Sequence, residues 1–153
     1  GPTDSANRIT LKFFLDEGGK LNTILKSNEA LGTGLSLELK RHENELEANL
    51  GFTEIEERVE VTPFLKKREF KPLQDSLELV VDIISLKKSR LRVLIYEGTV
   101  TQESVPSFDS NKVAKIENFS GGQFWGMILN HAKVVSVSAE PLPDYVTNQY
   151  SLF

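Results

Sequence analysis

The side chains that most often perform catalysis or bind metals are few in this chain and are not spaced as a reaction centre. His42 and His131 are the only histidines among 153 residues, and neither has a second histidine or a carboxylate at a metal-binding spacing. Cysteine is absent, which excludes a thiolate nucleophile, a thiolate metal site and a disulfide framework. We therefore predict a non-enzymatic protein with no metal site and no cofactor.

The sequence signatures of common enzyme classes are also missing. The chain has no Gly-x-Ser-x-Gly motif, no phosphate-binding glycine loop and no dinucleotide-binding fingerprint. Paired carboxylates for hydrolysis meet in space and not in sequence, so a hydrolase built on such a pair is the remaining catalytic alternative.

The charged residues are segregated into an acidic and a basic block, although the formal net charge is only −4. The acidic block comprises Glu43, Glu45, Glu47, Glu54, Glu56, Glu57 and Glu60. The basic block comprises Lys66, Lys67, Arg68, Lys71, Lys87, Lys88, Arg90 and Arg92. These surfaces could pair between copies of the chain or attract a charged partner, and the alternative is that both are ordinary solvated faces.

The basic block is also compatible with nucleic acid. Lysine and arginine neutralise phosphates, and the neighbouring Phe64 and Phe70 could stack on unpaired bases. The acidic balance of the whole chain opposes this interpretation, and phenylalanines in such segments more often anchor loops in the core. Nucleic acid is therefore a secondary partner hypothesis.

Two further segments carry side chains suited to binding. Phe124 and Trp125, the sole tryptophan, lie in a run framed by three glycines, where an exposed ring could contact a protein or a sugar. The alternative is that Trp125 fills the core. The chain ends with Leu152 and Phe153, an apolar tip that could dock on a neighbouring subunit or fold back onto its own core.

These candidate residues must be positioned by strands, because apolar side chains recur at every second position over most of the chain. The alternation predicts strands over residues 9–15, 21–25, 35–39, 77–86, 91–96, 113–119, 124–129 and 134–139. Within residues 43–60 a strand is favoured over a short helix. Gly18 and Gly19 predict a tight turn that joins the first two strands as a hairpin, and residues 130–133 predict another turn.

The strongest strand pattern lies in residues 76–100, which we predict to form a hairpin. Its first strand is apolar on both faces, as expected for a central strand that is covered on both sides. The polar segment 101–112 that follows is long enough to cross from one sheet to another.

Length and composition are those of one globular domain, with 39% hydrophobic and 26% charged residues. No apolar run approaches the roughly 20 residues that a membrane-spanning helix needs. A Gly-Pro start is what some tag-removal proteases leave, so we expect residues 1–2 to be such a remnant, residues 3–143 to form one domain and residues 144–153 to be a C-terminal tail. The absence of cysteine is compatible with the cytoplasm or another reducing compartment.

Eight or nine short strands and at most one short helix predict an all-β fold, an antiparallel β-sandwich of jelly-roll-like type. With no recognisable catalytic motif, we interpret the chain as a protein-interaction or self-assembly module of structural, scaffold or viral coat or matrix type. Its expected partner is another protein or a second copy of itself. The alternative is a β-sandwich that binds carbohydrate or nucleic acid through Trp125 or the basic block.

Overall fold

The computed structural model describes residues 7–27, 34–43, 45–53, 58–60, 76–87, 90–112 and 124–151. These residues form eight strands, one 3-10 helix and one short α-helix. The chain divides into two compact units: unit 1 holds residues 13–76 and 120–135, and unit 2 holds residues 3–12, 77–119 and 136–153. Among the described residues, no helix has the length and apolar character needed to cross a membrane.

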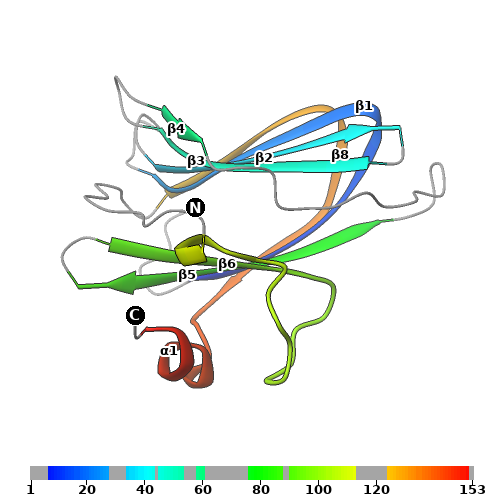
Figure 1. The fold of residues 1–153 in the computed structure, drawn as a ribbon. Coiled ribbons are helices and arrows are strands. Elements are labelled where there is room, and N and C mark those ends of the chain that lie inside the picture. The colour runs from blue at the N-terminus through cyan, green and yellow to red at the C-terminus, as the bar shows by residue number, and fades with distance from the viewer. Residues whose placement is uncertain are drawn as a thin grey trace. The chain divides into compact units, whose positions relative to one another are not determined.

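Unit 1 is built on β1 from residue 13 onward and on β2 to β4, and each of these strands pairs antiparallel with the next. They are β1 (Arg8–Ser27), β2 (Gly34–His42), β3 (Glu45–Thr53) and β4 (Arg58–Glu60). The long strand β8 (Phe124–Glu140) also pairs with β1. Figure 1 shows β2 and β3 side by side. The preference for a strand within residues 43–60 is confirmed, since β3 and β4 both lie there.

The predicted turn at Gly18 and Gly19 is wrong, because β1 continues through these residues as one strand. Gly18 has a φ of 74°, a left-handed conformation that glycine adopts without a Cβ clash. A positive φ inside a strand is typical of a β-bulge, which bends a strand without ending it. At Gly19, an added Cβ would overlap the backbone oxygen of His131, so the close approach of β8 also requires glycine.

The predicted turn at residues 130–133 is wrong for the same reason, because β8 continues from Phe124 to Glu140. His131 has a φ of 49°, which histidine adopts more readily than most residues with a side chain. The sequence therefore located both segments that contain a positive φ, but each of these positions bends its strand and does not reverse it.

The alternating pattern of the sequence becomes two faces of the sheet in unit 1. Cross-strand partners point to the same face of a sheet. The apolar face contains the rows Leu21, Leu39 and Ala48, and Thr23, Leu37 and Leu50, whose members are all exposed by 2% or less. The opposite face carries the polar residues of the same strands.

Unit 2 contains the hairpin predicted for residues 76–100. Strands β5 (Leu77–Leu86) and β6 (Arg90–Glu97) pair antiparallel, and the described register ends at Leu86 opposite Arg90. Most of β5 is buried, and β5 lies between β1 and β6 in the sheet order, so its prediction as a central strand is confirmed.

The expectation that residues 101–112 cross to another sheet is wrong, because this segment returns to β6. Strand β7 (Phe108–Asp109) pairs with β6 and leads into the 3-10 helix Ser110–Lys112. The amide of Val93 donates a 2.8 Å hydrogen bond to the hydroxyl of Ser110, which attaches this helix to β6 as well.

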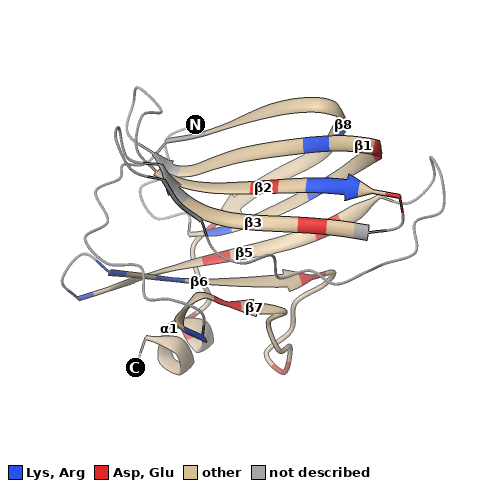
Figure 2. Cartoon of the chain, turned by 45° about the horizontal axis from the view of Figure 1, so that its top comes forward, with Lys and Arg blue, Asp and Glu red and all other residues tan. Residues whose placement is uncertain are grey.

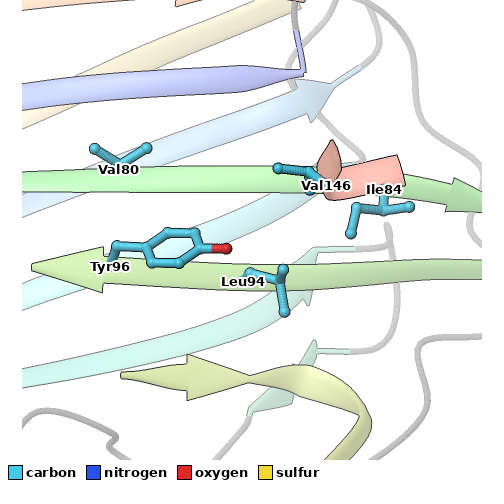
Figure 3. Packing of buried hydrophobic residues seen from close by; sticks show 5 residues of the cluster. All are labelled: Val80, Ile84, Leu94, Tyr96 and Val146. Carbon is cyan, nitrogen blue, oxygen red and sulfur yellow. The ribbon is translucent and has the colours of Figure 1, made fainter. Parts of the chain in front are cut away.

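The tail folds back onto unit 2 over most of its length. Helix α1 (Asp144–Tyr150) begins directly after Pro143 and buries Val146 completely. Val146 packs in a cluster with Val80, Ile84, Leu94 and Tyr96, whose side chains come from β5 and β6 (Figure 3). Burial of an apolar side chain of this size stabilises the fold by roughly 1.5–3 kcal/mol, so α1 is part of the core of unit 2.

The predicted all-β, antiparallel fold with at most one short helix is confirmed. The strands are longer than expected, because β1 and β8 each merge two predicted strands. The strand predicted for residues 113–119 lies outside the described residues.

Candidate functional site

Most of the predicted basic block lies outside the described residues. This applies to Lys66, Lys67, Arg68, Lys71 and Lys88. Of the others, Lys87 is exposed at the end of β5, and Arg90 and Arg92 lie on β6. A shared basic surface therefore stays a prediction.

Arg92 is engaged within unit 2. Its guanidinium donates to both carboxylate oxygens of Asp109 at 2.9 and 2.6 Å, and to the backbone oxygen of Tyr150 at 3.0 Å. It also lies 5.2 Å from the centre of the Tyr150 ring, within cation–π range. Arg92 therefore attaches α1 to β6 and β7, a structural role that explains its presence without an external anion.

A second arginine and aspartate pair holds the other side of α1. Arg8 donates to both oxygens of Asp82 at 2.7 Å, and these side chains are exposed by only 8% and 0%. Arg8 also approaches the hydroxyl of Tyr145 at 3.5 Å and its ring centre at 5.9 Å. The hydrogen bonds to Asp82 raise the pKa of Arg8 despite its burial, so the guanidinium stays charged.

The aromatic and terminal candidates are only partly described. Phe124 and Trp125 are the first two residues of β8, but their side chains lie outside the described part of the structure, as do Leu152 and Phe153. Further along β8, the apolar side chains of Ile128, Leu129 and Val135 are exposed by 66, 45 and 47%. Exposed apolar groups of this kind are candidates for contact with a partner.

The two histidines stay outside any metal centre in the described part of the chain. His42 is the last residue of β2, and its Nε2 lies 3.2 Å from a carboxylate oxygen of Glu47. His131 is exposed in β8. No three His, Asp or Glu side chains within the described ranges are grouped closely enough to hold a metal ion.

The most organised polar surface lies on β1, β2 and β3 of unit 1, opposite the apolar rows. We call it the polar face, and it consists of Lys20, Asn22, Glu38, Lys40, Glu47 and Asn49. The registers align these residues as two rows across the three strands: Lys20, Lys40 and Glu47, and next to it Asn22, Glu38 and Asn49. Figure 2 shows charged segments on all three strands.

Glu38 lies at the centre of the polar face and is held by two lysines. Its carboxylate oxygens lie 3.3 Å from Nζ of Lys20 and 3.0 Å from Nζ of Lys40. The Glu38 side chain is only 11% exposed, whereas those of Lys20 and Lys40 are 40 and 34% exposed. Burial alone would raise the pKa of Glu38, but the hydrogen bonds and charges of the lysines outweigh burial and lower it. Glu38 is therefore a fixed carboxylate.

The sequence analysis did not identify the polar face. The signal was present in β2, where Ser36, Glu38 and Lys40 alternate with leucines and so share one face. What the sequence lacked was the register that places Asn22 and Asn49 on either side of Glu38.

Comparison with known proteins identifies the class of fold. No protein-family model matches the chain, and no curated protein matches its sequence. Among solved structures, the chain is similar to the carbohydrate-binding module CBM66 from Bacillus subtilis, with a TM-score of 0.60 and 13% sequence identity. The similarity covers 89% of this chain and 75% of that protein. This chain therefore has an antiparallel β-sandwich fold, as predicted.

Proposed function

We propose that this chain is a non-catalytic module that binds carbohydrate. The observation that carries the proposal is the similarity of fold to a carbohydrate-binding module over 89% of the chain. This similarity supports carbohydrate binding, the alternative of the sequence analysis, more than it supports assembly with another protein.

Features of the chain itself support the proposal. The polar face presents carboxylate, ammonium and amide groups side by side, and such groups hydrogen-bond the hydroxyls of a sugar. Trp125 would add an aromatic ring, whose apolar body can cover the C–H face of a sugar. The scarcity of catalytic motifs agrees with binding without turnover.

The experiment is a binding screen against soluble polysaccharides by affinity electrophoresis, followed by calorimetry on those that bind. Because Trp125 is the sole tryptophan, its fluorescence reports separately on whether the sugar approaches it. We expect saturable binding to at least one polysaccharide and no release of reducing ends. Absence of binding across the panel would reject the proposal, and release of reducing ends would reject its non-catalytic part.

Assembly through β8 is the second candidate function. It is favoured by the exposed side chains of Ile128, Leu129 and Val135 on one long strand. Light scattering after size exclusion tests it, with Ile128→Lys as the variant expected to disrupt an oligomer. A monomer across the accessible concentration range would remove the self-assembly version of this candidate.

A further inference from the structure

The polar face combines groups that an ordinary solvated sheet surface does not require. A carboxylate on the outer side of a sheet normally stays in water, yet the residue Glu38 is only 8% exposed. Desolvating a carboxylate is unfavourable unless it is paired, and Glu38 has two lysine partners. The result is an acceptor whose position is fixed before any ligand arrives, which lowers the entropy lost on binding.

The two asparagines beside Glu38 have hydrogen-bonding capacity to spare. Asn22 and Asn49 are half-buried cross-strand partners of Glu38. Within the described residues, no hydrogen bond involves either side-chain amide. Each amide can donate two hydrogen bonds and accept through its oxygen. On each side of the fixed Glu38 carboxylate, the row thus places an amide with a donor and an acceptor that no described residue occupies.

The dimensions of this row suit a saccharide. Neighbouring strands lie about 4.8 Å apart, so three strands give a row about 10 Å wide. Ser36 and Gly51, which continue the same face toward one end of the strands, are buried, whereas Ile24 in the same row is half-buried and His42 at the other end of the face is exposed. A short stretch of glycan could lie across the strands, with hydroxyls directed at Asn22, Glu38 and Asn49.

The charges on the polar face balance. Lys20 and Lys40 supply two positive charges, and Glu38 and Glu47 supply two negative charges, so their sum is zero. A surface that binds a polyanion needs an excess of positive charge to displace counterions, which this face does not have. Its chemistry is instead that of many short, directional hydrogen bonds.

We propose that the polar face is the binding site for a neutral, polyhydroxylated glycan, with Glu38 as the central acceptor and Asn22 and Asn49 as the flanking amide contacts. This inference rests on the proposed function and deepens it, since it assigns both the site and the class of sugar. It excludes acidic polysaccharides and nucleic acid as ligands of this face.

The test uses the whole chain and a panel of neutral polysaccharides, namely glucans, mannans, xylans, galactans and fructans, together with acidic polygalacturonate and heparin. The site variants are Glu38→Gln and the double variant Asn22→Ala/Asn49→Ala. The matched controls are Glu140→Gln and Asn148→Ala, which make the same chemical changes at exposed positions of unit 2. Far-ultraviolet circular dichroism and thermal unfolding verify that each variant is folded.

We expect binding to a neutral polysaccharide, weakened about tenfold or more by each site variant. A hydrogen bond to the charged Glu38 contributes about 1.5–3 kcal/mol, and the hydrogen bonds of the two neutral amides together contribute about 1–3 kcal/mol. The controls should bind as the unmodified chain does. A neutral glycan that binds the site variants with unchanged affinity would overturn this inference and leave the proposed function intact. Binding only to the acidic polymers would overturn the assigned sugar class, and no binding at all would overturn the proposed function itself.

Discussion

Removing the carboxylate of Asp82 should destabilise unit 2 more than any single change at an exposed ion pair. Asp82 is fully buried and accepts two 2.7 Å hydrogen bonds from Arg8, which is itself only 8% exposed. In Asp82→Ala the guanidinium would stay buried without its counter-ion. The hydroxyl of Tyr145, at 3.5 Å, is too distant to replace two charge-assisted hydrogen bonds.

The magnitude follows from the burial of both partners. Breaking a buried ion pair by removing one partner costs about 3–5 kcal/mol, which is a large part of the roughly 5–15 kcal/mol that stabilises a typical domain. Replacing both partners with apolar residues of similar size, as in Arg8→Met/Asp82→Leu, should restore most of the loss, because no buried charge then remains. The control is Glu47→Gln, whose partner His42 is 61% exposed, and it should cost at most about 1 kcal/mol.

Urea unfolding measures these differences with a probe in each unit. All three tyrosines lie in unit 2 and the sole tryptophan lies in unit 1, so tyrosine near-ultraviolet circular dichroism and Trp125 emission follow the two units separately. With an m-value of about 2 kcal/mol/M, Asp82→Ala should lower the tyrosine midpoint by about 1.5–2.5 M. A shift below about 0.5 M, or a double variant as unstable as the single one, would refute the argument from buried charge.

Three further predictions concern particular side chains. Gly19→Ala should destabilise unit 1 by about 3 kcal/mol, because its Cβ would overlap the backbone of β8. Gly18→Ala should cost only about 1 kcal/mol, because alanine is strained at a positive φ but meets no neighbouring atom there. Equal urea midpoints for the two variants would contradict this difference. Thr23→Val should stabilise the chain by about 1 kcal/mol, measured in the same way, because the buried Thr23 hydroxyl has no hydrogen-bond partner among the described residues. Burial tends to raise the pKa of Asp109, but Arg92 outweighs burial and lowers it. The pair of Arg92 and Asp109 therefore contributes stability above about pH 4 that is lost as the pH falls through the folded-state pKa of Asp109. In acid titrations of the unfolding free energy, Asp109→Asn should show a shallower decline than the unmodified chain.

The sequence predicted strands well because alternation is a local property. The leucines of β2 and the doubly apolar pattern of β5 both identified their elements and their faces. The turns at Gly18 and at residues 130–133 failed because glycine and positive-φ positions are common to reversals and to bulges. The pairing of β1 with β8 distinguishes a bulge from a reversal, and it brings Gly19 beside His131, more than a hundred positions away in the sequence.

The position of the C-terminal tail also depends on contacts with residues that are distant in sequence. The sequence left open whether residues 144–153 dock elsewhere or fold back, because a polar segment with the apolar tip Leu152 and Phe153 suits either outcome. The structure shows that α1 combines the buried Val146 with contacts from two arginines that are distant in sequence. Neither the burial of Val146 nor the arginine contacts can be predicted from the tail sequence, because both depend on the sheet that brings Arg8 and Arg92 beside α1.

The polar face depends on the core beneath it. Asn22, Glu38 and Asn49 form a row only in the observed register, and a slip of one residue would move their side chains to the opposite face of the sheet. That register is held by the buried apolar rows on the other side, of which Leu37 is a completely buried member. A substitution at Leu37 that loosens the strand pairing should therefore weaken glycan binding, although Leu37 contacts no sugar. A substitution at Leu37 that leaves a cavity but keeps the register should lower the stability of the fold and leave the affinity for glycan unchanged.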